Sequence, residues 1–213
     1  MATTSEMFDQ LRDLLTDPTD TQVSFATKKL YLNRGIQRLW PKVYRVASTT
    51  INLVAATYDY SLATSVMDGY ILSVEVSTVT AGTEFRRFDN YDIVTGDEDL
   101  AGVFRLGLHP GDGFIVRIKY AAPLANIAAV DYAAAQAETW VGPDRAIGLP
   151  VLYAMGLIAG RKLDDRQDAT IYSTTQALNG VTDQDLMAAS QMWFAQFELE
   201  LEAVSRPMPP ARD

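Results

Sequence analysis

The chain has 213 residues, no cysteine, one histidine and a formal net charge of −9 at pH 7. Hydrophobic residues make up 48% of it, a share typical of a folded globular protein and too high for a disordered one. The lack of cysteine excludes disulfides, thiolate catalysis and Cys-based metal sites, and the acidic balance argues against a protein that grips nucleic acid through a concentrated basic surface.

We expect neither a membrane span nor a secretory signal. No apolar run approaches the roughly 18 residues that cross a bilayer. The opening sequence MATTSEMFDQLRDLL lacks a basic region followed by a long apolar stretch. These features predict a protein that makes no membrane contact, and the absence of cysteine fits assembly in the cytoplasm.

Residues 1–46 predict two helices. Ser5 is placed to cap the first, and Asp17-Pro18-Thr19-Asp20 breaks it. The second helix is expected to begin after Thr21 or Ser24 and to end between Trp40 and Arg45, because Pro41 cannot continue it. The expected buried stripes are Met7, Phe8, Leu11, Leu14 and Leu15 in the first helix, and Phe25, Leu32, Ile36, Leu39 and Val43 in the second. The opposite, solvent-facing side of the second helix is expected to carry Lys28, Lys29, Arg34 and Gln37.

Residues 47–121 change to a period of two, which indicates strands. The stretch TTINLVAATYDYSL contains two alternating runs around Ala55-Ala56, and YILSVEVSTV is rich in β-branched residues. The pentad His109-Pro110-Gly111-Asp112-Gly113 has the chemistry of a hairpin turn between 102–108 and 114–121. This part therefore predicts a compact antiparallel unit of roughly five to six strands.

Residues 122–204 return to helix. The alanine-rich stretch 122–138 gives no clear pattern, whereas Gly142-Pro143-Asp144 is typical of a helix start, with Pro150 tolerable in a late first turn. A long helix follows a capping box at Thr182 and Asp185, and its predicted core stripe is Leu186, Ala189, Trp193, Phe197 and Leu201. Residues 205–213, with three prolines, predict an extended tail.

The resulting fold class is α+β. The N-terminal helices (1–46) and the C-terminal helices (122–204) must pack on one another, because neither pair alone buries its stripe. The antiparallel β-unit (47–121) is then an insertion into a helical bundle, and 205–213 extends from it.

Catalytic and metal-binding patterns are weak in this sequence. His109 is the single histidine and sits in a turn, and no phosphate-cradling glycine motif occurs. The acidic clusters Gly96-Asp97-Glu98-Asp99 and Asp164-Asp165 lack the spacing of a calcium loop. We therefore expect no enzyme, no metal site and no cofactor.

Aromatic and arginine residues of the β-unit leave two interpretations open. Tyr58, Tyr60 and Tyr91 either fill the core of the unit or form a binding platform for a ligand such as a glycan or peptide. Arg86 and Arg87 either lie solvated on a strand or contact a partner's carboxylates or phosphates.

The arrangement resembles the head-to-tail adaptor (connector, or neck) proteins of tailed bacteriophages. The resemblance rests on LRDLL, LNRGIQRLWPKVYR, TTINLVAATYDYSL, YILSVEV, FRRFDNYDI and the long helix after TDQDL, and it spans nearly the whole chain. One departure is Ala63, where members of the family often have proline after Tyr-x-Leu.

The resemblance implies a structural ring in the virion neck, assembled in the host cytoplasm. Such adaptors join about a dozen copies below the portal protein, in the closed symmetry typical of homo-oligomers, extend the DNA channel and dock the stopper or tail protein. DNA passes through the lumen without specific binding. In several members the C-terminal segment reaches the portal. By resemblance, the portal-binding residues here are Ser205, Arg206, Pro207, Met208, Pro209, Pro210, Ala211, Arg212 and Asp213. The alternative is a tail or baseplate accessory module that binds a glycan or peptide through Tyr58, Tyr60 and Tyr91.

Overall fold

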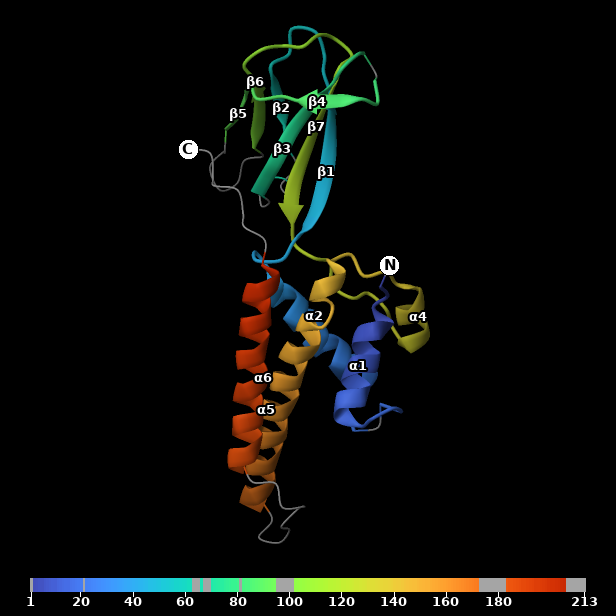
Figure 1. Cartoon of the computed structure of the whole chain (residues 1–213), viewed down its shortest axis with the longest axis vertical. Helices are drawn as coiled ribbons and strands as arrows, with labels where there is room; N and C mark the ends of the chain where they lie inside the picture. The colour runs from blue at the N-terminus through green and yellow to red at the C-terminus, as the bar shows by residue number, and fades with distance from the viewer. Residues whose placement is uncertain are drawn as a thin grey trace. The chain divides into compact units, whose positions relative to one another are not determined.

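The computed structural model describes residues 2–20, 22–62, 66, 70–80, 82–94, 102–172 and 183–205, with residues 162–172 described by their backbone alone. The chain divides into two compact units (Figure 1). A helical unit joins Met1–Val43 to Leu124–Arg206, and the described part of a β unit is Tyr44–Pro123. The fold is therefore α+β with an inserted antiparallel region, which confirms the predicted fold class.

The helical unit is organised around one long helix. Its elements are α1 (Ser5–Leu15), α2 (Phe25–Leu39), α4 (Tyr132–Ala137), the 3₁₀ turn η1 (Asp144–Ala146), α5 (Leu149–Tyr172) and α6 (Asp183–Val204). Helix α5 contacts α1, α2 and α6, so segments from both ends of the chain share its surface. Among the described residues, none of the helices combines the length and apolar character needed to cross a membrane.

The predicted helix boundaries are close to the observed ones, with three corrections: the cap of α1, the end of α2 one residue before the predicted range, and α5, which begins at Leu149 after the 3₁₀ turn at Asp144–Ala146. Ser24 caps α2 by accepting a hydrogen bond from the backbone N–H of Thr27 at 3.2 Å, and α2 ends at Leu39, just before Pro41. Ser5 was wrong as a cap. It is the first residue of α1, and Thr4 precedes it with a hydroxyl that donates to the Ala135 carbonyl oxygen at 3.0 Å.

A single hydrophobic core fills the helical unit. The predicted stripes are mostly buried, although Leu14 is 47% exposed. The α6 stripe is confirmed, with Phe197 and Leu201 buried and Leu186, Ala189 and Trp193 half-buried. The core includes Met7, Phe8, Leu11, Leu32, Ile36, Leu39, Leu149, Ala154, Ile158, Phe197 and Leu201.

The alanine-rich stretch is mainly an extended strap. The extended residues 123–130 are held against α2 by Asn33. The side-chain amide of Asn33 accepts a hydrogen bond from the N–H of Ile127 and donates one to the carbonyl oxygen of Ile127. Asp131 then caps the short α4 by accepting from the N–H of Ala134 at 2.8 Å. Short-range periodicity could not predict this strap, because its backbone groups are satisfied by a residue far away in sequence.

Two sheets make up the β unit, and all their strand pairs are antiparallel. The first has the order β1 (Arg45–Asn52), β7 (Ile115–Ala122), β3 (Tyr70–Ser77), β4 (Phe85–Arg87). The second has the order β2 (Asp59–Ser61), β6 (Val103–Leu106), β5 (Tyr91–Val94). Inward side chains of both sheets share one core, which includes Leu53, Leu62, Val74, Val76, Phe104, Leu106, Val116 and Ile118.

The predicted hairpin between 102–108 and 114–121 was wrong. The pentad after β6 does turn the chain, with φ values of +143° at Gly111 and +73° at Gly113, but β6 and β7 belong to different sheets. The first strand also begins earlier than its sequence pattern indicates, at Arg45, because it pairs with β7 over its whole length from Arg45 opposite Ala122 to Asn52 opposite Ile115.

We predict that Gly35→Ala lowers the free energy of unfolding by about 1–3 kcal/mol. A Cβ at Gly35 would lie 2.8 Å from the Cα of Pro150 and 2.9 Å from its carbonyl oxygen, so the backbones of α2 and α5 would have to separate. This cost opposes the gain of about 1 kcal/mol that alanine normally brings to a helix interior. Urea denaturation followed by circular dichroism measures the difference.

Gly160→Ala is the matched control for that substitution. Gly160 also lies within a helix, but its added Cβ would meet the Ser190 Oγ at an ordinary 3.6 Å. We expect this variant to be neutral or more stable than the parent. Equal destabilisation by both substitutions would contradict a tight α2–α5 contact.

Candidate functional site

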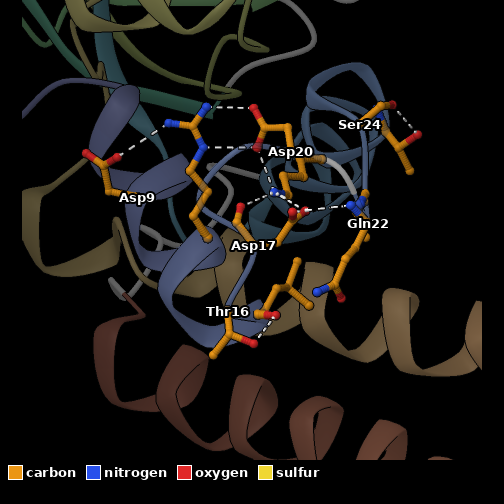
Figure 2. Close-up of polar contacts among 11 residues, drawn as sticks. Asp9, Thr16, Asp17, Asp20, Gln22 and Ser24 are labelled. Atoms are coloured by element: carbon orange, nitrogen blue, oxygen red, sulfur yellow. Dashed lines mark hydrogen bonds and ion pairs between the residues drawn. The ribbon is translucent and has the colours of Figure 1, made fainter.

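The most unusual group in the described structure is a lysine in the core of the helical unit. Lys28 of α2 is fully buried, and its ammonium nitrogen lies 3.0 Å from Oδ2 of Asp17 and 2.7 Å from Oδ1 of Asp20 (Figure 2). It also donates to the carbonyl oxygen of Asp17 at 3.3 Å. The prediction that Lys28 lies on the solvent-facing side of its helix was therefore wrong.

Asp17 is as deeply buried as the lysine, with 1% of its side chain exposed. It accepts hydrogen bonds from the backbone N–H groups of Gln22 at 3.2 Å and Val23 at 3.0 Å, in addition to the lysine (Figure 2). The loop between α1 and α2 therefore wraps around this carboxylate. A buried charge is tolerated only when such partners replace its lost hydration.

Asp20 connects the buried lysine to α1. Its carboxylate accepts hydrogen bonds from Nε of Arg12 at 3.0 Å and from a terminal guanidinium nitrogen of Arg12 at 2.6 Å, so the two side chains form a bidentate ion pair (Figure 2). These hydrogen bonds from Arg12, with the further one from Lys28, lower the pKa of Asp20 below its ordinary value.

The same network reaches α4 through Arg12. Its guanidinium carbon lies 4.0 Å from the ring centroid of Tyr132, whose hydroxyl donates to Oδ1 of Asp9 at 2.6 Å. That hydrogen bond to Asp9 raises the pKa of Tyr132. Thus α1, α2, the loop between them and α4 are joined by one chain of polar contacts.

This polar cluster has the character of a structural site rather than a reactive one. Its charges are mutually compensated, and no buried side-chain nitrogen or oxygen within the described part of the chain lacks a hydrogen-bond partner. A shallow pocket of about 170 Å³ lies beside it, lined by Gln22, Val23, Ser24, Thr27, Tyr31, Ile158 and Arg161. That volume is below the range of about 300–1,000 Å³ that small-molecule sites occupy.

The sequence did contain a signal for the cluster. Lys28 lies three residues after Phe25 and four before Leu32, so helical spacing places it on the buried stripe. Asp17-Pro18-Thr19-Asp20 was interpreted as a helix breaker, which is correct, but its two carboxylates are also the partners of that lysine. A lysine inside an apolar stripe, preceded by acidic residues in a loop, is a sequence pattern that indicates a buried ion pair.

Arg86 and Arg87 are both exposed on β4 and point to opposite faces of the sheet. Arg87 pairs with Asp89 at 2.9 Å on the surface, and Arg86 lies opposite Val76 in the strand register. The two side chains therefore do not form one clamp, and a contact of either with a partner stays a prediction.

A second ion cluster lies on the outer face of the four-stranded sheet. Glu75 of β3 accepts from Lys119 at 2.6 Å and from Nε of Arg117 at 2.8 Å, and both donors come from β7. Hydrogen bonds from Lys119 first, and then from Arg117, lower the pKa of Glu75. Arg117 also stacks over Phe85 at 3.9 Å, so sequence-distant strands are fastened on this face as well.

The tyrosines proposed as a ligand platform are separated in the structure. Tyr60 uses its hydroxyl to accept from the N–H of Val54 at 2.9 Å and donate to the carbonyl oxygen of Thr57 at 3.0 Å. Tyr91 stacks on Phe104 with ring centroids 5.4 Å apart, inside the β core. The core interpretation is therefore confirmed for Tyr60 and Tyr91. It was wrong for Tyr58, which is 50% exposed.

His109 has a local structural role. Its Nδ1 accepts from the N–H of Gly111 at 3.1 Å, which leaves Nε2 to donate to the carbonyl oxygen of Val54 at 2.9 Å. The ring of Tyr58 meets it edge-on at 5.6 Å. Across the described residues, no group of three or more His, Asp or Glu side chains is placed to hold a metal ion. The clusters at 97–99 and 164–165 lie outside the described side chains.

The predicted portal-binding tail begins at the end of α6. The backbone N–H of Ser205 donates the last helical hydrogen bond of α6, to the carbonyl oxygen of Leu201 at 2.9 Å. The hydroxyl of Ser205 donates to the carbonyl oxygen of Glu202. Residues 206–213 of that tail, and Thr182 of the predicted capping box, lie outside the described residues.

Comparisons with known proteins find similarity only among solved structures, and at low sequence identity. No protein-family model matches the chain, and no curated protein matches it. Among solved structures, a chain from the "neck of empty GTA particle computed with C6 symmetry" is similar over 91% of this chain and 92% of that chain. The two are 13% identical and superpose with a TM-score of 0.33, values at which likeness establishes no function.

We predict that Lys28→Met lowers the free energy of unfolding by about 3–5 kcal/mol, because it leaves the carboxylates of Asp17 and Asp20 without their shared cation. Lys29→Met is the matched control. Its ammonium donates to the Ala128 carbonyl oxygen at an exposed site, so we expect a change within about 0.5 kcal/mol. Chemical denaturation of both variants tests this, and equal losses would contradict a special role for Lys28.

The lowered pKa of Asp20 predicts a stability that depends on pH. A carboxylate with a folded-state pKa below its unfolded value of about 3.9 stabilises the fold above that pH, and the contribution is lost as pH falls through the folded-state pKa. The stability difference between the parent and Asp20→Asn should therefore be largest near neutral pH and shrink below about pH 4. Urea denaturation across that range measures it, and a difference that grows with acidification would refute the assignment.

Proposed function

We propose that this chain is a non-enzymatic head-to-tail adaptor of a tailed phage or phage-like particle. In this role, copies of the chain form a ring below the portal protein, extend the DNA channel and dock the stopper or tail protein. The number of copies is about a dozen, within the closed cyclic symmetry that homo-oligomers favour.

The observation that supports the proposal is that helices from before and after the β unit pack into one core. Helices α1 and α2 precede the β unit and α5 and α6 follow it, yet all four contribute to one hydrophobic core. The sequence resemblance described above implies this organisation, a helical wall interrupted by an antiparallel insertion. It spans nearly the full chain, so it does not depend on a single motif.

The charge of the chain is compatible with a DNA conduit. A basic lumen would retain the genome, because phosphate neutralisation releases counterions and favours binding. The net charge of the chain, −9, is opposite in sign to such a surface. The ion clusters around Lys28 and Glu75 also engage basic side chains within the protein.

The proposal predicts that the chain is a component of particles produced from the genome that encodes it. Deleting its gene should yield filled heads without tails, and a plasmid copy should restore tailed particles. Mass spectrometry of purified particles and negative-stain microscopy of their necks provide the measurements. Tailed, infectious particles that lack the chain would overturn the proposal.

A chain that ends at Ser205 separates portal attachment from folding. Under the proposal it should keep the thermal stability of the full chain, because the helical core ends at α6, but lose binding to the portal. If the shortened chain binds the portal as tightly as the full chain, residues 206–213 do not contribute to portal binding. The adaptor role would then still be tested by the particle experiment.

A further inference from the structure

Helix α6 carries a second apolar stripe that its own chain leaves exposed. The stripe runs along the side opposite the packed residues Trp193, Phe197 and Leu201. Met192 is 54% exposed and Leu199 is 72% exposed. Its members, at helical spacings of four, three, four and four, are Ala188, Met192, Ala195, Leu199 and Ala203. Large apolar side chains aligned along one exposed helix face are typical of an interface.

The charges on α6 and α2 have opposite signs. Helix α6 contains five acidic residues (Asp183, Asp185, Glu198, Glu200 and Glu202) and no basic one. Helix α2 contains four basic residues (Lys28, Lys29, Arg34 and Arg38) and no acidic one. Since Lys28 is buried, the exposed positive charge of α2 comes chiefly from Arg34 and Arg38.

The exposed side of α2 also has an apolar centre. Leu30 is 50% exposed and lies one helical turn from both Ala26 and Arg34, which are exposed as well. We define this α2 surface as Ala26, Leu30, Arg34, Gln37 and Arg38. Like the α6 stripe, it combines an apolar strip with charge of a single sign.

The two surfaces belong to different sides of the helical unit. Helix α6 packs on α5 at Tyr153 and Gly156, where the rings of Phe194 and Phe197 meet Tyr153 at 5.2 Å. Helix α2 packs on α5 at Pro150, against Gly35. Each exposed surface faces away from its own contact with α5, so one copy can present α6 to one neighbour and α2 to another.

We propose that the α6 stripe of one copy binds the α2 surface of a second copy of this chain. Leu199 and Met192 would be buried against Leu30, while Arg34 and Arg38 would lie beside Glu198, because Glu202 is already paired with Lys42 of its own chain. Such an interface joins unlike surfaces, so it repeats head to tail and closes into a ring when the rotation permits. This inference rests on the proposed adaptor function, for which it specifies the contact between neighbouring copies.

The cysteine-free sequence permits a direct test by site-specific crosslinking. The full chain is prepared as Leu30→Cys, Leu199→Cys and the double variant, and is treated at high concentration with a bifunctional maleimide that tolerates small shifts in register. The double variant should give a ladder of covalent oligomers. A mixture of the two single variants should stop at dimers, and each single variant alone should remain monomeric.

Two controls make the outcome specific. Val79→Cys, exposed on the β unit at 59%, measures the products of random collision. Adding Arg34→Glu and Arg38→Glu to the double-cysteine variant should abolish the ladder through like-charge repulsion, and adding Glu198→Lys to this charge-reversed variant should partly restore it. Circular dichroism of each variant verifies that the helices remain folded.

Three results would overturn the inference. The first is a yield of crosslinked products no higher than that of Val79→Cys. The second is dimers from Leu199→Cys alone, which would indicate a two-fold contact between α6 helices, and the third is a ladder that the arginine reversals leave unchanged. Failure of the interface is distinguishable from failure of the proposed function. A chain found in particle necks without these crosslinks rejects only the interface, whereas a ladder from a chain absent from particles rejects only the adaptor role.

Discussion

Burial of the Lys28 ammonium is the constraint around which the N-terminal half of the helical unit is built. An ion of that size costs several kcal/mol to remove from water, so its partners must be held in place before α2 can pack. The loop from α1 to α2 supplies them. It turns through left-handed backbone at Thr16 and Asp20, with φ of +50° and +55°, and delivers two carboxylates to one nitrogen.

That arrangement fixes more than a pair of charges. Arg12 clamps Asp20 from α1 and stacks on Tyr132 of α4, so the start of the chain is linked to a segment that follows the β insertion. The extended strap before α4 is held to α2 through Asn33. Polar contacts thus join α1 and α2 to α4, a short helix whose only buried residue is Ala135.

The remaining exposed surfaces are understandable once this internal pairing is recognised. Basic residues near the core are committed to carboxylates, and α2 keeps its outward arginines unopposed by acids on the same helix. Helix α6, whose single partner of any extent is α5, keeps an apolar and acidic outer side. A protein that works as a ring needs two unlike surfaces of this kind, since each copy must meet two neighbours.

The sequence by itself determined the fold class and most helix boundaries. Apolar spacing of three and four residues defines a buried face whatever that face meets, and Ser24 and Pro41 act on the backbone locally. These signals identified α1, α2 and α6 and the change from helix to strand in the middle of the chain. They also placed Phe197 and Leu201 in the core.

Tertiary structure alone decided which distant groups meet. The segments at 102–108 and 114–121 look like a hairpin locally, but β6 and β7 pair with strands elsewhere in the sequence because two sheets must cover one core. Lys28 was assigned to solvent because lysine is rarely buried, and only the folded loop reveals the carboxylates that make its burial possible. Helical periodicity specifies the face of the helix on which each side chain lies. The residue that the side chain contacts depends on which distant segment the fold places against that face.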